Sequence, residues 1–93
     1  EKGFFEKDLA REYLKFAQSL GFQITIHADQ LTLSGGSELA RELKALSADH
    51  VLQLGVDEIQ KLSQSEVTAV LLPLADLYMN VAYPPARDLI DAG

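Results

Sequence analysis

Apolar residues recur at helical spacing near the start of the chain, from Glu6 to Leu20. Gly21 follows directly and supplies a natural helix stop, because glycine readily adopts the left-handed backbone that ends a helix. The sequence therefore predicts an amphipathic helix that packs against another element through one apolar side. This side is formed by Leu9, Tyr13, Phe16 and Leu20 and is flanked by Ala10, Leu14 and Ala17.

Three further helices are predicted later in the chain. Ser37 and Asp57 are residue types that cap helix N-termini, and each precedes a helical pattern of apolar side chains. Pro84 and Pro85 lie where a last helix would begin, since proline suits the first helical turn. The apolar positions that support these helices are Leu39, Ala40, Leu43 and Leu46, then Ile59 and Leu62, then Leu89 and Ile90.

Three short segments with β character lie between the predicted helices. Residues 22–27 are rich in β-branched and aromatic side chains, and residues 67–72 are almost wholly apolar until Pro73 ends them. Residues 47–51 form a third, more polar candidate. Strands that are apolar on both faces are typical of parallel sheets covered by helices.

The predicted helices and strands alternate, with the strands about 20 to 25 residues apart, which is the period of βα units joined by right-handed crossovers. The predicted fold class is therefore α/β. Three such units cannot close a (β/α)8 barrel, which needs about 250 residues, nor a flavodoxin-like sheet of about five strands. We therefore expect residues 1–93 to be a portion of a larger domain whose beginning and final strands are absent.

Exposed edges of parallel strands also predict a homo-oligomer.

Composition narrows the function classes. Lys and Arg number 8 against 14 for Asp and Glu, and a net charge of -6 would repel a phosphate backbone, so we expect no nucleic-acid partner. No apolar run reaches the roughly 18 residues of a membrane span, so we expect no membrane partner. With 0 cysteines, any metal must be held by nitrogen and oxygen ligands, and a reducing cytoplasm fits this composition.

The chain has 2 histidines, and both lie at or just after the C-terminal end of a predicted strand. This is the rim where parallel α/β enzymes place their sites. A single histidine in such a place is more often a rim residue satisfied by a backbone hydrogen bond. Two histidines on consecutive strands, each near an aspartate, instead favour metal ligation and proton transfer. These pairs are His27 with Asp29 and His50 with Asp49.

Other polar candidates are less specific. Gln30 would lie on the loop above the rim, where its amide could hold a polar substrate group, although a solvated loop residue shows the same pattern. The segment Ser34 to Ser37 lacks the spacing of a phosphate-binding loop and indicates a glycine turn. Tyr78 and Tyr83 flank a predicted loop that either covers a pocket or packs under a long connection.

Several segments together resemble the imidazolonepropionase family. They run in order and at compatible spacing from about Phe22 to the end of the chain, and the pair "HADQ" (residues 27–30) and "ALSADH" (residues 45–50) is the specific part. The remaining segments are "GGSELA" at 35–40, "VTAVLLP" at 67–73 and "PARDLIDAG" at 85–93.

The resemblance implies an amidohydrolase-superfamily (β/α)8 barrel of the metal-dependent hydrolase type, with one zinc or iron ion. Such an enzyme opens the lactam of 4-imidazolone-5-propanoate to N-formimidoyl-L-glutamate in histidine degradation. By the same resemblance His27 binds the metal, Gln30 contacts the substrate, and His50 lies beside the reacting carbonyl as a substrate-binding and catalytic group. A metal ion draws charge from an amide oxygen and acidifies water, which suits this reaction.

The sequence also departs from the family pattern. The family's His-x-His metal pair and its later metal-binding aspartate have no counterpart in residues 1–93, so we expect this piece alone to be inactive. Leu74 stands where the family usually has glycine after "LLP", so the adjoining pocket wall departs from the family pattern.

Two alternatives remain open from the residues. Another amidohydrolase, such as a cytosine or guanine deaminase, would place metal ligands on the same strand ends. A non-catalytic α/β module would use both histidines structurally.

Overall fold

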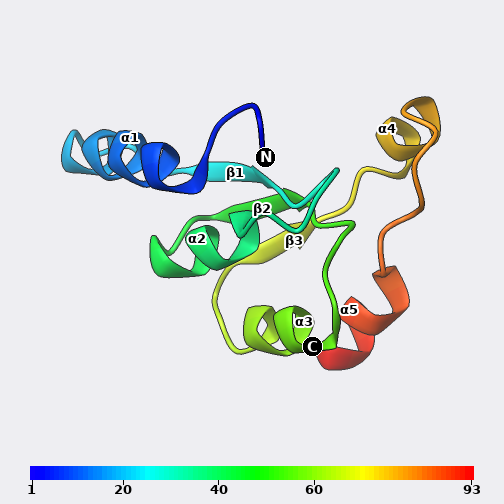
Figure 1. Ribbon diagram of the computed structural model, residues 1–93. Helices are drawn as coiled ribbons and strands as arrows, with labels where there is room; N and C mark the ends of the chain where they lie inside the picture. The colour runs from blue at the N-terminus through cyan, green and yellow to red at the C-terminus, as the bar shows by residue number, and fades with distance from the viewer.

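The computed structural model describes residues 1–93 and contains a small parallel sheet with helices around it (Figure 1). The α/β class predicted from the sequence is confirmed. The helices are α1 (Lys7–Ser19), α2 (Gly36–Glu42), α3 (Val56–Ser63), α4 (Pro73–Tyr78) and α5 (Ala86–Ala92). The strands are β1 (Thr25–Ala28), β2 (Ser47–His50) and β3 (Thr68–Val70).

The three strands follow one another across the sheet in chain order, β1-β2-β3, and both pairings are parallel. Thr25, Ser47 and Thr68 lie side by side in one row of the ladder. The next row joins Ile26, Ala48 and Ala69, and the third joins His27, Asp49 and Val70. Because side chains alternate along a strand, the first and third rows lie on one face and the middle row on the other.

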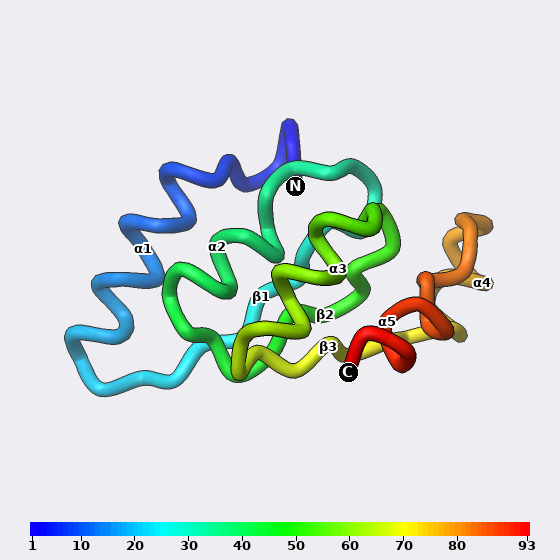
Figure 2. The backbone as a smooth tube through the Cα atoms, turned by 90° about the horizontal axis from the view of Figure 1, so that it is seen from below, coloured from blue at the N-terminus to red at the C-terminus, as the bar shows by residue number.

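Helices cover one face of this sheet. In Figures 1 and 2, α2 and α3 lie on the same side of the strands, and α5 packs beside α3. The middle row of the sheet contributes to this interface, since Ala48 is buried in the apolar core and Ile26 and Ala69 pack against it. The opposite face carries the polar side chains of rows one and three.

Helix α1 packs through the flank of its predicted apolar side. Ala10 is buried and Leu14 packs against the core, whereas the four central residues of the expected apolar side are exposed. These are Leu9, Tyr13, Phe16 and Leu20, which are between 59% and 65% exposed. The prediction of an amphipathic helix packed on another element is therefore confirmed for the flank, through Ala10 and Leu14, and wrong for the four central residues. Of these four, Tyr13 contacts the Phe5 ring, with the ring centroids 6.1 Å apart.

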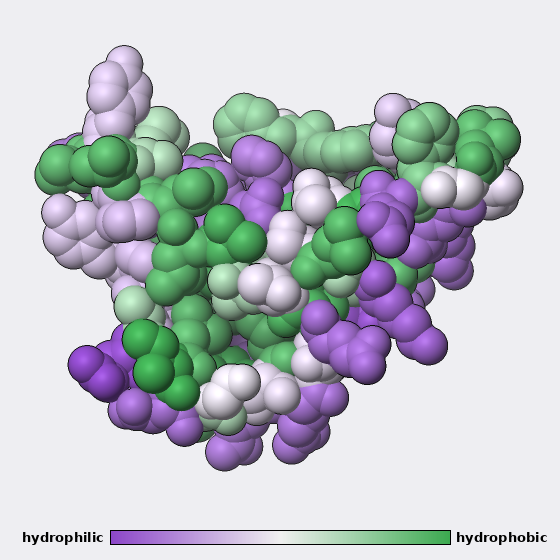
Figure 3. All heavy atoms as spheres, turned by 180° about the vertical axis from the view of Figure 1, so that it is seen from behind, coloured by the Kyte–Doolittle hydropathy of each residue, from purple (hydrophilic) through white to green (hydrophobic).

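Apolar side chains are exposed over much of the surface. Figure 3 shows them as several green areas on the face seen from behind, and 18 of 93 residues are buried. Such extensive apolar exposure is typical of surfaces that contact further protein. The longest helix has 13 residues, and none of the helices combines the length and apolar character needed to cross a membrane.

Both predicted N-caps are displaced by two residues. Helix α2 has Gly35 at its N-cap, so Ser37 lies inside the helix. Helix α3 has Gly55 at its N-cap, and the Glu58 carboxylate accepts a hydrogen bond from the Gly55 N–H at 3.1 Å, so Asp57 is not the cap. In both cases a carboxylate other than the predicted cap accepts backbone N–H at the helix start, four groups at α2 and one at α3, and the cap position itself can be glycine.

A short helix, α4, occupies part of the segment predicted as a loop after Pro73. Proline at the first position suits a helix start, and the helix ends at Tyr78. It lies beyond the C-terminal ends of the strands (Figure 1). Tyr78 and Tyr83 are exposed, so neither packs under the connection in residues 1–93.

We expect Gly36→Ala to destabilise the protein by about 1 to 3 kcal/mol, because overpacking at a rigid contact forces the backbone to shift. A Cβ at Gly36 would lie 2.8 Å from the Ala28 Cα, where α2 meets the end of β1. The matched control is Gly55→Ala, whose Cβ would meet only the flexible Glu58 carboxylate at 3.0 Å. Urea unfolding midpoints of both variants measure the difference, and equal midpoints would contradict the expected close contact.

Candidate active site

The two histidines come together at the C-terminal ends of neighbouring strands. His27 lies near the end of β1 and His50 is the last residue of β2. The His50 Nε2 atom is 3.1 Å from the His27 Nδ1 atom, and the ring centroids are 4.9 Å apart at 49°. His50 is buried, whereas the side chain of His27 is 73% exposed. One imidazole is therefore held inside the protein and the other is open at the rim.

Backbone strain explains how the two rings meet. In the ladder His27 pairs with Asp49, and Ala28 pairs with His50, so strict alternation would put the two rings on opposite faces. His50 and Val51 instead have φ of 75° and 48°, in the left-handed region. That conformation is costly for a β-branched residue such as Val51, and strained backbone of this kind clusters at functional sites.

Asp49 is a neighbour of His27 in the structure, although the sequence suggested that it would accompany His50. One Asp49 oxygen, Oδ2, lies 3.9 Å from the His27 Nε2 atom. The other, Oδ1, accepts a hydrogen bond from the Ser47 hydroxyl at 2.7 Å. The ladder accounts for this arrangement, because Ser47, Asp49 and His27 all lie on the face without helices.

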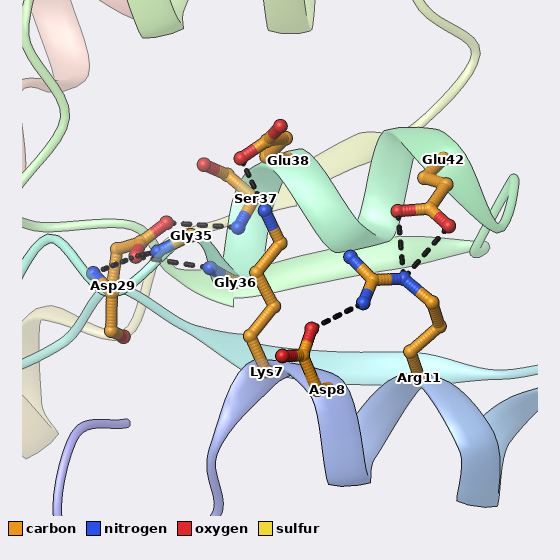
Figure 4. A network of polar contacts seen from close by, with 10 residues as sticks. Lys7, Asp8, Arg11, Asp29, Gly35, Gly36, Ser37, Glu38 and Glu42 are labelled. Atoms are coloured by element: carbon orange, nitrogen blue, oxygen red, sulfur yellow. Dashed lines mark hydrogen bonds and ion pairs between the residues drawn. The ribbon is translucent and has the colours of Figure 1, made fainter.

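Asp29 is fully buried and serves the backbone, so the sequence-based pairing of Asp29 with His27 for metal chemistry is wrong. Its Oδ1 accepts the N–H groups of Ser34, Gly35 and Gly36, and its Oδ2 accepts that of Ser37 at 2.8 Å (Figure 4). Burial alone would raise the pKa of Asp29, but the hydrogen bonds from Ser37, Ser34 and Gly36 lower it below its ordinary value. The carboxylate thereby fixes the turn that follows His27.

Gln30 lies on this turn, half-buried, one residue beyond Asp29. Its backbone N–H donates to the Glu1 carboxylate, and its carbonyl accepts a hydrogen bond from Gln53 Nε2 at 3.2 Å. The same carboxylate accepts the N–H groups of Leu31 and Thr32. Burial opposes ionisation of Glu1, yet these hydrogen bonds lower its pKa. The backbone of Gln30 is thus fixed, and its side-chain amide makes no protein hydrogen bond.

Ion pairs connect α1 to α2 beside this turn. Figure 4 shows Lys7 extending to Glu38, and Arg11 bridging Asp8 and Glu42. The hydrogen bonds from Lys7 and Arg11 lower the pKa values of Glu38 and Glu42 respectively. Because these pairs are exposed, they orient the helices more than they stabilise them.

Asp76 is a buried acidic residue that the sequence did not single out. It lies on α4 with no exposed surface, and its Oδ1 is 4.0 Å from the His50 Nδ1 atom. Neither Asp76 oxygen has a hydrogen-bond partner, and neither does His50 Nδ1. No local pattern announces this residue, because six-residue helices show no clear apolar period and an aspartate in one is usually solvated.

The side chains of residues 1–93 could supply one ligand to a metal ion, but they do not form a complete metal site. No group of three or more His, Cys, Asp or Glu side chains is arranged to hold a metal ion. His27 Nε2 nevertheless presents an accessible imidazole nitrogen on the face without helices, which is a suitable ligand for zinc or iron. A catalytic metal needs about three protein ligands, so further ligands would have to come from outside residues 1–93.

A cleft of about 550 Å³ runs along the free edge of β1. His27 and Gln30 line it together with apolar side chains such as Phe4 and Leu14. The cleft separates α1 from the edge of the sheet, where an additional strand would pair with β1. We therefore assign the chemistry to the strand-end part of this cleft, where His27 and Gln30 lie.

We expect Asp29→Asn to destabilise the protein by about 2 kcal/mol, because hydrogen bonds to a charged group contribute about 1.5 to 3 kcal/mol and the amide offers one acceptor instead of two. Asparagine tolerates the left-handed φ of 50° at this position, so the backbone is not at issue. Urea unfolding measures the loss. Glu66→Gln, at an exposed residue without a hydrogen bond, is the control, and an equal effect of both variants would contradict the role of Asp29.

Comparison with known proteins adds a relationship over the whole chain. No protein-family model matches the chain. The chain is 63% identical over 93 residues to an imidazolonepropionase of Bdellovibrio bacteriovorus. It is 48% identical over 93 residues to one of Phocaeicola vulgatus, and 46% identical over 94 aligned residues to one of Bacillus velezensis. Each match covers 100% of this chain and 22% of the relative. From its first residue to its last, the chain is therefore similar to a segment of imidazolonepropionase and spans about a fifth of the length of these relatives.

Proposed function

We propose that the protein containing this chain is a metal-dependent hydrolase that opens the lactam ring of 4-imidazolone-5-propanoate to N-formimidoyl-L-glutamate. The observation that carries the proposal is the His27–His50 pair, 3.1 Å apart on adjacent strand ends, within a chain that is 63% identical to an imidazolonepropionase. A deaminase-like amidohydrolase would use similar strand ends, but the named relatives favour a cyclic amide.

Residues 1–93 would form an arc of a (β/α)8 barrel in this proposal. Strands that succeed one another in a single direction, with right-handed crossovers, place all their helices on one face. The observed order β1-β2-β3, with α2 and α3 on the same face, fits such an arc, whereas a doubly wound sheet reverses its order and has helices on both faces. The face without helices would then line the barrel interior.

His27 would hold the metal ion through its exposed Nε2 atom, with other ligands supplied by the rest of the protein. A zinc or iron ion supplies Lewis-acid chemistry, because it polarises an amide carbonyl and acidifies water. The turn held by Asp29 keeps His27 at the strand end, which limits the reorganisation needed on binding.

His50 would bind the substrate and act on the reacting carbonyl. Its burial keeps the imidazole in a low-dielectric environment, where a positioned hydrogen-bond donor or proton carrier is more effective than in water. Gln30 would contact the substrate through its side-chain amide, which no protein group occupies. The fixed backbone of Gln30 would direct that amide over the rim.

We also propose that the full protein is a cytoplasmic homo-oligomer acting on a small molecule. The exposed apolar side chains support an extensive contact with further protein, part of which would be the remaining barrel and part a second subunit. Light scattering of the full-length protein tests the oligomer, and a monodisperse monomer would contradict it.

We expect His50→Gln and His27→Gln to separate the two histidine roles in the full-length protein. His50→Gln should lower kcat about 100-fold or more, as loss of a general acid–base group does, while the metal content stays unchanged. His27→Gln should lower both activity and metal content, because a ligand is lost. Absorbance of 4-imidazolone-5-propanoate follows the reaction, and elemental analysis gives the metal.

Three outcomes would contradict the proposal. A metal-loaded full-length protein that does not consume the substrate, but deaminates cytosine or guanine, would identify another amidohydrolase. A protein without bound metal after purification in zinc and iron would favour a non-catalytic module. Retention of kcat in His50→Gln would remove the catalytic role of His50.

A further inference from the structure

A buried carboxylate without a partner faces the buried histidine of the candidate site. Asp76 has 0% exposure and two unpaired oxygens, and one of these is 4.0 Å from the unpaired His50 Nδ1 atom. An unpaired buried polar group costs about 1 to 3 kcal/mol, and more if it is charged. A movement of about 1 Å would bring the pair to hydrogen-bond distance and satisfy the His50 Nδ1 atom and one Asp76 oxygen.

The backbone around Asp76 places it at this position. The short helix α4 follows β3, the strand beside β2, so it lies over the end of the strand that carries His50. The Asp76 N–H donates to the Leu72 carbonyl at 3.2 Å, and the Asp76 carbonyl accepts from Val81 N–H at 3.1 Å. Asp76 therefore approaches His50 through a backbone that is hydrogen-bonded on both sides.

The other nitrogen of His50 is linked to His27, and this link ties the two rings together. A hydrogen bond between His50 Nε2 and His27 Nδ1 needs one proton between them, so one ring must donate and the other accept. If His50 carries its proton on Nδ1, its Nε2 accepts and His27 donates from Nδ1. His27 Nε2 is then left with a free lone pair. In the opposite arrangement the proton lies on His27 Nε2.

Resting on the proposed function, we propose that Asp76 is a positioning residue that sets the tautomers of both histidines. In the protein without bound substrate, its carboxylate accepts the His50 Nδ1–H, so that His50 Nε2 accepts the His27 Nδ1–H and His27 Nε2 presents its lone pair at the rim. A metal ligand needs this unprotonated nitrogen, and second-shell partners of ligating histidines commonly fix it in this way.

A second carboxylate, that of Asp49, favours the opposite tautomers of the two histidines, and the structure indicates which carboxylate has the larger effect. Asp49 Oδ2 lies 3.9 Å from His27 Nε2 and would favour a proton on that nitrogen. The Asp49 side chain is 17% exposed and already accepts the Ser47 hydroxyl, whereas that of Asp76 is 0% exposed and has no other partner. A hydrogen bond is stronger in the less polar environment, and the unpaired group loses more if it stays unpaired. Asp76 therefore dominates the choice of tautomer.

The test uses the full-length protein, stripped of metal, with histidine labelled with nitrogen-15. Two-bond correlation spectra distinguish protonated from unprotonated ring nitrogens, and His50→Gln and His27→Gln assign the signals. The expected result is protonated Nδ1 in both rings of the wild type, with loss of that pattern in Asp76→Ala. Zinc affinity, measured by competition with a chelator, should weaken about 10- to 100-fold in Asp76→Ala.

Asp76→Asn keeps the size of the side chain and one acceptor oxygen, so it should fold and show an intermediate tautomer population and zinc affinity. Asp88→Asn, an exposed carboxylate on α5, is the matched control and should change neither. Unchanged tautomers in folded Asp76→Asn and Asp76→Ala would overturn the proposal.

Both readouts are independent of the substrate. If the wild type shows the expected tautomers and binds zinc but does not open 4-imidazolone-5-propanoate, the proposed function fails and the role of Asp76 stands. If the wild type opens the substrate and the Asp76 variants leave the tautomers unchanged, the role of Asp76 fails and the function stands.

Discussion

The candidate site depends on the buried carboxylate of Asp29. This side chain accepts the backbone N–H groups of four successive residues, 34 to 37, at the start of α2. Those groups have no partners within the helix, so a single carboxylate both satisfies them and fastens the helix to the end of β1. The turn that begins directly after His27 is consequently rigid, and Gly36 can lie against Ala28 at a distance that excludes a larger residue. A rigid strand end is what a ligand or catalytic side chain requires.

Strain and burial are concentrated at the end of the neighbouring strand. The left-handed backbone at His50 and Val51 breaks the alternation of β2 and turns the His50 ring toward His27. Asp76 of the short helix α4 lies beside the same residue, with its Oδ1 atom 4.0 Å from the His50 Nδ1 atom. A strained backbone, a histidine pair and an unpaired buried carboxylate within one small region cost stability, and their coincidence is typical of sites kept for function.

The remainder of the surface indicates how the chain is used. One face of the sheet is covered by helices, the other carries polar side chains, and one side of α1 exposes large apolar residues. A parallel sheet is normally buried on both faces, so these surfaces suit contacts with additional protein. The relatives are consistent with such contacts, since each is matched over 22% of its length. The exposed surfaces and the partial coverage of longer relatives therefore both suit contacts with further protein.

Residue type and spacing by themselves determined the α/β order and four of the five helices. They also determined the position of His27 and His50 at strand ends. All these features depend on residues that are close neighbours in the sequence. The tertiary structure alone decided which acidic residue lies beside which histidine. Asp29 serves the backbone, Asp49 lies beside His27, and Asp76 approaches His50 from a helix too short to show a period in the sequence. Such pairings depend on strand register, on positive φ at the strand end and on packing between segments more than 20 residues apart, none of which is encoded in a local pattern.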